Sequence, residues 1–176
     1  MLNKPKGYVV TRSDEKDRKT VYDLLPEWAY AESWMPVGRL DLDSKGLLLF
    51  TQDSKMADRL TRPGSCSKTY EVWVRGHVTE DQIGEMEKGV KVEKELLKAV
   101  RVEIKGGAGP KTRLEVELDE GKNRHIRRMF GALKDPKFGT PLKVLELKRV
   151  QIGALKLDVE SGKWRFLNPS EESSLK

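Results

Sequence analysis

The alternation of apolar and polar residues predicts a chain in which strands predominate and helices are short. The clearest strand covers 68–75, where Tyr70, Val72 and Val74 share one face and Trp73 lies on the other. A first strand is expected from Leu2, interrupted by the turn signal of 4–7. Apolar runs and strand propensity predict further strands over 8–11, 35–40, 46–51, 100–104, 114–118, 142–150 and 154–159.

Capping residues and helix breakers predict the helices. Thr79 and Gln82 form a capping-box pattern that opens a helix ending at Gly89. Other helices are expected over 21–25 before Pro26, after Asp53, after Asn123, and as one turn after Pro169, with a flexible loop over 106–110. Because strands and helices do not alternate strictly, the pattern favours an α+β fold with a mixed, mainly antiparallel sheet.

Length and composition limit the class of protein. A chain of 176 residues is expected to form a single domain with a real core. It has no apolar run of the ~18 residues that a membrane span needs, and its first residues do not form a secretory signal. One cysteine and two histidines exclude an internal disulfide and a zinc site. We expect a cytoplasmic, metal-free monomer.

Positive charge is concentrated in one stretch of the sequence. The net charge is +6, and residues 119–149 alone hold nine Lys or Arg against four Asp or Glu. Such a stretch predicts one positive face, which would suit the phosphate backbone of a nucleic acid. A solvated surface that happens to be basic is the alternative, and charge alone leaves both open.

Two aspartates lie close together in the segment Gly38-Arg39-Leu40-Asp41-Leu42-Asp43-Ser44-Lys45-Gly46. A calcium loop is excluded, because the position that should hold a bidentate glutamate is Gln52. Two interpretations remain. Asp41 and Asp43 either bind backbone donors in a turn between buried strands, or one of them faces a cleft and takes part in chemistry.

Tyr70 and an arginine-rich segment are the other candidates. A tyrosine on the apolar face of a strand is either a core residue or a ring that packs on a bound base. Beyond Asn123, the apolar stripe of the expected helix leaves Arg124, Arg127 and Arg128 off that stripe. Cations near a helix N-terminus make sense if a phosphate or carboxylate is held there.

Together these segments resemble the pseudouridine synthases of the ribosomal small-subunit type, a family that also includes several large-subunit enzymes. The resemblance covers nearly the whole chain and keeps the order of the family's motifs. They are residues 2–7, Gly38 to Asp41, Asp43-Ser44, 46–49, Lys68 to Tyr70, Arg124 to Met129, 147–153 and 162–165. His125 stands where the family often has Gln, and Ser44 where it often has Thr. The resemblance implies that the sequence begins directly on the catalytic domain, without the small RNA-binding domain that many members carry; either this member has no such domain, or the domain has been removed.

The resemblance implies the family's catalytic fold, with a central active-site cleft, and conversion of uridine in RNA to its C-glycoside isomer. It implies no metal, nucleotide or redox cofactor. Asp41 matches the catalytic aspartate, Arg127 the basic residue that pairs with it, and Tyr70 the tyrosine that packs on the target base. Leu147 matches a leucine that walls the base pocket, and Arg39 the residue that fills the space left by the flipped base.

The remaining site residues are expected to bind RNA. They are Lys68, Lys122, Arg124, Arg128 and Arg149. The expected partner is ribosomal RNA, free or in a pre-ribosomal particle, with large-subunit (23S) RNA slightly favoured over small-subunit (16S) RNA. The alternative is a non-catalytic RNA-binding or ribosome-assembly module that uses the same basic face but needs no ionised carboxylate in a cleft.

Overall fold

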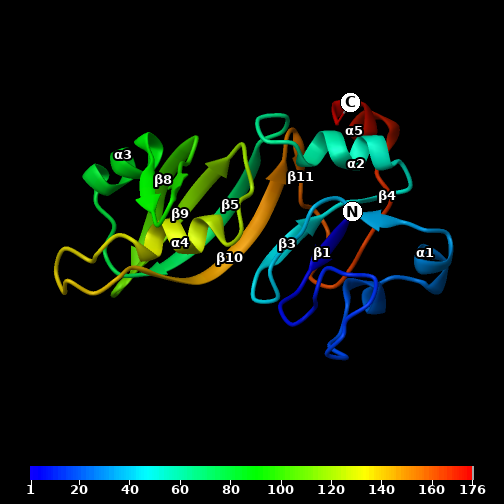
Figure 1. Cartoon of the computed structure of the whole chain (residues 1–176), viewed down its shortest axis with the longest axis horizontal. Coiled ribbons are helices and arrows are strands. Elements are labelled where there is room, and N and C mark those ends of the chain that lie inside the picture. Colours follow the sequence, from blue (N-terminus) through cyan, green and yellow to red (C-terminus); the bar gives the residue numbers. More distant parts are fainter. Residues whose placement is uncertain (176) are drawn as a thin grey trace. The chain divides into compact units, whose positions relative to one another are not determined.

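The structure is a computed structural model that describes residues 1–175. The chain divides into two compact units. Unit 1 comprises Met1–Cys66 and Lys148–Lys176, and unit 2 comprises Ser67–Leu147. Each unit is described by itself (Figure 1). Within residues 1–175, no helix is both long enough and apolar enough to cross a membrane.

Unit 1 combines a small mixed sheet with short helices. Strand β1 pairs antiparallel with β3, and β3 pairs parallel with the second half of β10. Strand β11 pairs antiparallel with β10, and β2 with β4. The strands are β1 (Leu2–Lys4), β2 (Met35–Pro36), β3 (Lys45–Leu48), β4 (Phe50–Thr51), β10 (Lys143–Ile152) and β11 (Leu155–Lys156). The helices are η1 (Val21–Leu24), α1 (Glu27–Ala31), α2 (Ser54–Thr61) and α5 (Pro169–Ser174).

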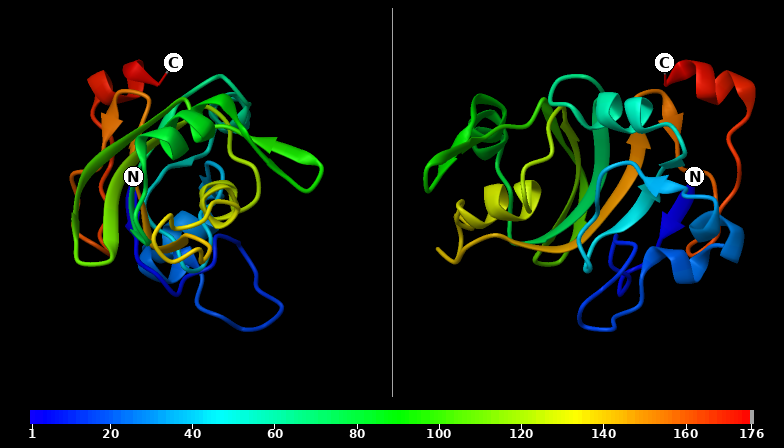
Figure 2. Two further views of the ribbon diagram at one scale, coloured as in Figure 1. Left: turned by 90° about the vertical axis from the view of Figure 1, so that its left-hand side faces the viewer. Right: turned by 45° about the vertical axis from the view of Figure 1, so that its right-hand side comes forward.

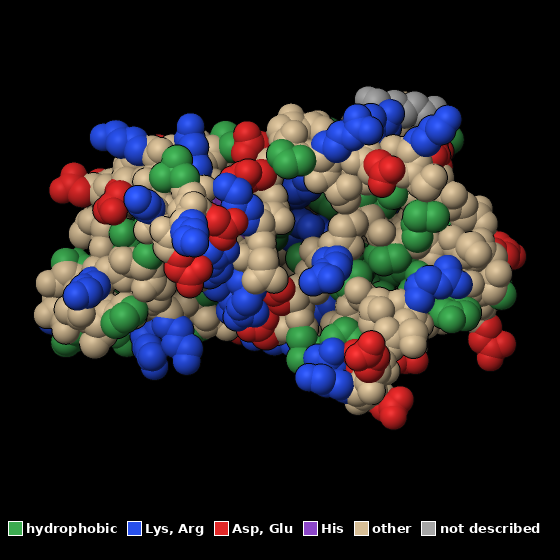
Figure 3. Space-filling model, viewed as in Figure 1, with side chains coloured by type: hydrophobic (Ala, Val, Ile, Leu, Met, Phe, Trp, Pro, Cys, Tyr) green, Lys and Arg blue, Asp and Glu red, His purple; other side chains and the backbone are tan. Residues whose placement is uncertain are grey.

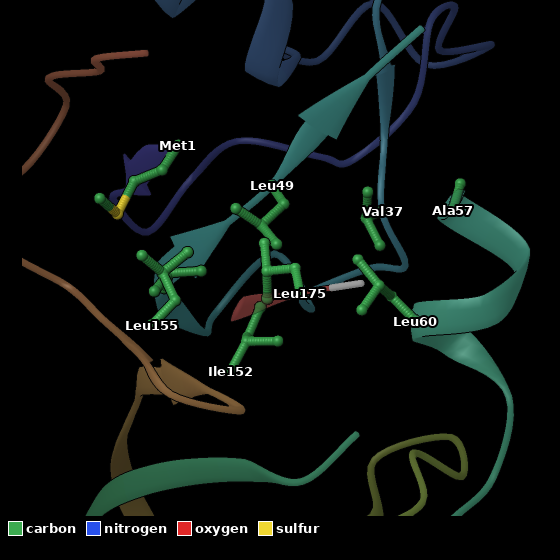
Figure 4. Packing of buried hydrophobic residues seen from close by; sticks show 9 residues of the cluster. Met1, Val37, Leu49, Ala57, Leu60, Ile152, Leu155 and Leu175 are labelled. Carbon is green, nitrogen blue, oxygen red and sulfur yellow. The ribbon is translucent and has the colours of Figure 1, made fainter. Parts of the chain in front are cut away.

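The core of unit 1 joins parts of the chain that are far apart in sequence. Figure 4 shows Leu49 and Ile152 packed together with side chains from both ends of the chain, Met1 and Leu175. The helix α2 contributes Leu60 to this cluster. Burial of these apolar side chains therefore holds the two separate segments of unit 1 together.

A group of aromatic side chains lies at another part of unit 1. Trp28 is stacked on Phe166, with ring centroids 5.8 Å apart, and lies edge-on to Trp34 and Trp164. Edge-to-face and offset pairs of this kind are the favoured arrangements of aromatic rings. These contacts join α1 to the C-terminal segment.

Unit 2 contains three long antiparallel strands in the order β5-β9-β8. Its strands are β5 (Lys68–Arg75), β6 (Val90–Val92), β7 (Glu95–Leu97), β8 (Arg101–Ala108) and β9 (Lys111–Leu118), with the first half of β10. Its helices are α3 (Glu80–Lys88) and α4 (His125–Gly131). Both views in Figure 2 show α4 on one side of these strands. The helix buries Met129 and Phe130 completely.

Several predicted elements are confirmed. Strand β5 covers the predicted residues, with Tyr70, Val72 and Val74 buried on one face. The Thr79 hydroxyl accepts a hydrogen bond from Gln82 N, and α3 ends before Gly89 as expected. The Asp53 carboxylate caps α2. The α+β class with mixed, mostly antiparallel strand pairing is also confirmed.

Four predicted strands are shortened or divided in the structure, and the one expected over 154–159 is reduced to β11. Within 8–11, Val9 forms only an isolated bridge to Thr20. The strand expected over 35–40 is shortened to β2, because Gly38 turns the chain with a φ of +70°. The strand expected over 46–51 is divided into β3 and β4 at Leu49, whose carbonyl accepts a hydrogen bond from Val37 N.

The sequence patterns also missed several elements. Pro26 was expected only to end a helix, but it is the N-cap of α1, where its fixed φ is compatible with helix entry. The hairpin of β6 and β7 turns at Glu93, which has a positive φ without being a glycine. The flexible loop expected over 106–110 is incorrect, because β8 continues to Ala108 through a bulge between Ile104 and Gly106.

The start of α4 is a further correction. The N-cap is Arg124 rather than Asn123, and its backbone is left-handed at φ 47° and ψ 35°. Arg124 makes no side-chain capping hydrogen bond. In this seven-residue helix, Arg127 and Arg128 are the third and fourth residues.

Candidate functional site

The segment that carries Asp41 forms a turn between β2 and β3 in unit 1. The Asp41 carbonyl accepts a hydrogen bond from Ser44 N at 3.0 Å. Ser44 is buried, Asp41 is half-buried, and Arg39 and Asp43 are exposed. The turn is held from the N-terminal side as well, because Gly7 N donates to Leu42 O at 2.9 Å. Asp41 therefore lies on a well-anchored turn and not on a loose loop.

A buried lysine provides a second anchor for this turn. Lys4 has no exposed surface, and its Nζ donates to the carbonyls of Ser44 at 2.7 Å, Asp41 at 3.1 Å and Pro5 at 3.1 Å. Burial lowers the pKa of Lys4 from 10.5 to about 8, although the Asp41 and Asp43 carboxylates act in the opposite direction. An ammonium group has three donors, and all of them are used here.

A hollow of about 410 Å³ lies beside the turn, within unit 1. Asp41 and Arg39 line it, together with residues of the preceding loop that include Thr11, Asp14 and Arg18. Its lining is more polar than apolar. Asp41 is thus a half-buried carboxylate at the edge of a concave, polar space.

Arg149 and Gly46 form a close contact between β10 and β3. A Cβ at Gly46 would lie 2.2 Å from Arg149 O, and Gly46 has a φ of +112°, so this position requires glycine. The Arg149 side chain is 4% exposed and its Nε donates to Leu47 O at 2.8 Å. Its observed role is to link two strands beside the Asp41 turn, and contact with RNA stays a prediction.

In unit 2, β5 positions Lys68 and Tyr70. Tyr70 lies opposite Val116 of β9, and 8% of its surface is exposed. Lys68 is half-buried, and Leu147 on β10 is buried with 6% exposed. The Tyr70 ring is consistent with both interpretations of the sequence, since a largely buried ring can be part of the core and still present an edge to a ligand.

The helix α4 positions the arginines. Arg127 is half-buried and its Nη1 donates to Val144 O at 3.3 Å. Arg128 forms an ion pair with Glu95 on β7, and this hydrogen bond lowers the pKa of Glu95. Lys122 Nζ donates to Leu96 O at 2.8 Å. Lys122 and Arg128 therefore connect the segment around α4 to the β6–β7 hairpin.

The segment around α4 carries an excess of positive charge. Figure 3 shows Lys and Arg side chains over α4, with Asp and Glu side chains among them, and residues 119–149 hold nine Lys or Arg against four Asp or Glu. Arg124 is exposed in this segment. His125 is buried, and burial lowers its pKa, so it is neutral at pH 7 and takes part in packing.

The predicted site residues belong to both units. Unit 1 holds Asp41, Arg39 and Arg149, of which Asp41 and Arg39 line one hollow. Unit 2 holds the other predicted residues: Lys68, Tyr70, Lys122, Arg124, Arg127, Arg128 and Leu147. Lys4 was expected only as part of a turn, and its role in anchoring Asp41 was missed. In the part of the chain that the structure describes, no group of three or more His, Cys, Asp or Glu side chains is placed to hold a metal ion.

Comparison with known proteins gives consistent results. The family model "RNA pseudouridylate synthase" matches residues 1–132. The ribosomal large subunit pseudouridine synthase B of Haemophilus influenzae is 37% identical over 158 residues, covering 89% of this chain and 42% of the relative. That of Vibrio cholerae serotype O1 is 36% identical over 176 residues, covering 98% of this chain and 52% of the relative. This chain thus spans about half the length of these curated relatives.

A solved structure supports the same assignment. A crystal structure of a pseudouridylate synthase superimposes with a TM-score of 0.85 at 32% identity, covering 99% of this chain and 72% of that chain. A match of this quality extends over both units and includes the Asp41 turn. With the family model matching most of the sequence, the chain belongs to the RNA pseudouridylate synthase family.

Proposed function

We propose that this chain isomerises a uridine of ribosomal RNA to pseudouridine, and that large-subunit RNA is the substrate. The observation that carries the proposal is the half-buried Asp41 carboxylate, which lies in the matched family region and lines a polar hollow. The Haemophilus and Vibrio relatives are ribosomal large subunit pseudouridine synthases, which supports large-subunit RNA as the substrate.

The proposed reaction exchanges one glycosidic bond for another. The bond between N1 of uracil and C1′ of ribose breaks, the base turns, and C5 bonds to C1′. The C5 proton is then lost and N1 gains a proton, so the product is an isomer of the substrate. Ionised Asp41 acts as a nucleophile or stabilises positive charge at C1′. Its half-buried position in an anchored turn suits a group that must be aimed at one atom.

Residues of unit 2 complete the proposed chemistry. We assign Arg127 the role of the basic residue that acts with Asp41, as the family resemblance implies. Tyr70 packs on the target base and assists proton transfer, and Leu147 walls the pocket against water. The target base must leave its stack to react, and Arg39 fills the space that it vacates. The burial of Tyr70 and Leu147 is compatible with a place in the pocket lining and equally with a place in the core of unit 2.

RNA is held mainly through its phosphates. We assign this role to Lys68, Lys122, Arg124, Arg128 and Arg149, with additional contacts from Lys134, Lys137 and Lys143. The excess of positive charge over 119–149 supports the assignment. Arg149 is the weakest member of the set, because its guanidinium group is buried between strands.

The direct test uses the purified chain and unmodified ribosomal RNA transcripts of both subunits. Pseudouridine is mapped by carbodiimide modification and primer extension. We expect one modified position in the large-subunit transcript. Tight binding without any pseudouridine, on transcripts and on pre-ribosomal particles alike, would favour a non-catalytic RNA-binding module instead. Mapping ribosomal RNA from a deletion strain then identifies the uridine in the cell.

The Lys4→Met variant tests the anchoring of the Asp41 turn. Methionine keeps the length of the side chain but cannot donate to the Asp41 and Ser44 carbonyls. Because a displacement of about 1 Å can cost ~10²-fold in rate, we expect kcat to fall roughly 10- to 100-fold with little change in KM. Steady-state kinetics, measured on the transcript in which wild type forms pseudouridine, provides the test.

The pH dependence of stability distinguishes Lys4 from an ordinary core residue. Its folded pKa of about 8 is below its ordinary value of 10.5, so the folded state bears the cost of a buried charge at low pH. This cost is relieved as the pH rises from 8 to 10.5, by an amount on the order of 3 kcal/mol. Urea unfolding of wild type should therefore gain stability over this range relative to Lys4→Met. If the free energies of unfolding of wild type and Lys4→Met changed with pH in parallel, and the variant kept the wild-type kcat, Lys4 would neither bear a buried charge nor anchor the Asp41 turn.

The Arg124→Asn variant tests the phosphate contacts without straining the backbone. Arg124 has a left-handed backbone, a conformation that asparagine adopts readily. Loss of one phosphate contact should reduce the slope of log K against log salt by roughly 0.7–0.9. Arg101→Gln is the matched control, because Glu103, Glu115 and Glu117 already surround that guanidinium. An unchanged slope for Arg124→Asn would place the phosphate contacts elsewhere.

A further inference from the structure

Phe138 is the most exposed large apolar side chain of the described residues. It lies in the loop between α4 and β10 (gold in Figure 1), and 61% of its surface is accessible to solvent. Phe166 is nearly as exposed at 59%, but it is stacked on Trp28 within an aromatic group. Phe138 lies beside the His77 ring, with centroids 6.2 Å apart and the ring planes tilted by 42°, so it is not stacked on that ring. Exposure of an apolar ring to water is unfavourable in free energy, and a ligand that covers the ring would remove this cost.

The charge around Phe138 is positive. Residues 131–143 include three exposed lysines, Lys134, Lys137 and Lys143, and their one acidic residue, Asp135, is only 2% exposed. Lys137 Nζ lies 5.3 Å from the centre of the Phe138 ring. The loop therefore presents an aromatic ring among cations. This combination suits a nucleotide, whose base can stack and whose phosphates can pair with the lysines.

The loop is held in a defined shape by the buried Asp135 carboxylate. One of its oxygens accepts hydrogen bonds from Lys137 N at 2.7 Å and Phe138 N at 3.1 Å. The other accepts one from His77 N at 2.8 Å and lies 3.1 Å from His77 Nδ1. Burial alone would raise the pKa of Asp135, but these hydrogen bonds outweigh it and hold the pKa at about 2. The carboxylate is thus ionised at neutral pH.

Backbone hydrogen bonds close the loop at its base. Asp135 N donates to Thr140 O at 2.8 Å, and Leu142 N donates to Leu133 O at 2.9 Å. Gln82 of α3 adds a hydrogen bond to Lys134 O at 2.7 Å. Gly76 allows the close approach of β5 and the loop, since a Cβ there would lie 2.4 Å from Leu142 Cδ2. An ordered loop loses little conformational freedom when it binds a ligand.

We propose that Phe138 is a stacking site for an unpaired RNA base, with Lys134, Lys137 and Lys143 binding the phosphates that flank it. The inference rests on the proposed action of this chain on RNA and adds a contact outside the predicted catalytic residues. It explains why an aromatic ring is held outward by a buried carboxylate. It also gives the unmodified part of the substrate a fixed point of contact in unit 2.

The test compares variants in binding to a short fluorescein-labelled oligouridylate, measured by anisotropy at several salt concentrations. Base–aromatic stacking predicts that Phe138→Ala binds roughly 5- to 100-fold more weakly. Phe138→Leu should be nearly as weak, because leucine keeps the apolar area but has no aromatic face. Val100→Ala, at an exposed apolar position of the same unit, should bind like wild type. Melting curves should be unchanged for all three variants.

Replacing all three lysines by alanine should reduce the slope of log K against log salt concentration by about 2. Crosslinking of an iodouridine-substituted oligonucleotide should label the peptide that contains Phe138. Wild-type affinity in both Phe138 variants would overturn the stacking site, whatever the lysines do. The proposed function is tested separately: absence of pseudouridine with Phe138-dependent binding would refute the enzymatic role alone, and normal isomerisation with Phe138-independent binding would refute only this inference.

Discussion

The Asp41→Asn variant is expected to lose isomerisation, by at least about 10³-fold in single-turnover rate, while the fold and RNA binding remain. Asparagine has nearly the same shape as aspartate, but it carries no charge and is a poor nucleophile. The turn should persist, because Lys4 Nζ and Ser44 N donate hydrogen bonds to the Asp41 backbone carbonyl, which the substitution retains. Pseudouridine formation and oligonucleotide affinity are measured on the same preparation.

Asp43→Asn is the matched control for this prediction. Asp43 lies two residues away in the same turn and is more exposed than Asp41. Its substitution should leave the rate within a few-fold of wild type. If Asp43→Asn were inactive and Asp41→Asn active, the roles of the two carboxylates would be exchanged. Equal activity of both variants would remove this turn from the chemistry.

Two substitutions of Tyr70 are expected to separate the role of its ring from that of its hydroxyl. Tyr70→Phe keeps the ring but removes the hydroxyl, so RNA affinity should stay within a small factor while the rate falls roughly 10²- to 10⁴-fold. Tyr70→Ala should lose both affinity and rate. Because the side chain is 92% buried, as the 8% exposure implies, the alanine variant also leaves a cavity on the face of β5.

A purely structural tyrosine gives a different result. In that case Tyr70→Phe changes neither rate nor affinity appreciably, and Tyr70→Ala lowers only the melting temperature. Val72→Ala, at a fully buried position on the same face of β5, measures the cost of a cavity without any change of ring chemistry. A wild-type single-turnover rate for Tyr70→Phe would remove the hydroxyl from the mechanism and leave Asp41 and Arg127 as its proposed core.

Elements set by local chemistry could be predicted from the sequence. Strand β5 has strict alternation, and α2 and α3 have side chains that cap their first turns. Elements that depend on backbone conformation were missed. The β6–β7 hairpin turns at Glu93, and Arg124 is the N-cap of α4. Both residues have a positive φ, which cannot be predicted from side chains of these types. Propensity favoured a strand over 8–11, but tertiary context leaves only one bridge there.

For the candidate site, motif resemblance named Asp41, and the structure places it on the edge of a hollow in unit 1. The burial of two cations was not predicted. Lys4 reaches carbonyls about forty residues away, a relationship with no local signal. Arg149 shares a strand face with Leu147, and the alternation along β10 could have indicated its burial. Positive charge in a sequence therefore does not by itself place a side chain on the surface.

The aromatic group of unit 1 also gives the chain an internal optical probe. Of the four tryptophans, Trp28, Trp34 and Trp164 lie within that group, and Trp73 is in unit 2. Intrinsic fluorescence consequently reports mainly on unit 1, and Trp73→Phe makes it report on unit 1 alone. Circular dichroism reports on the secondary structure of both units, including the long strands of unit 2. The cooperativity of the two units is thereby accessible without any attached dye.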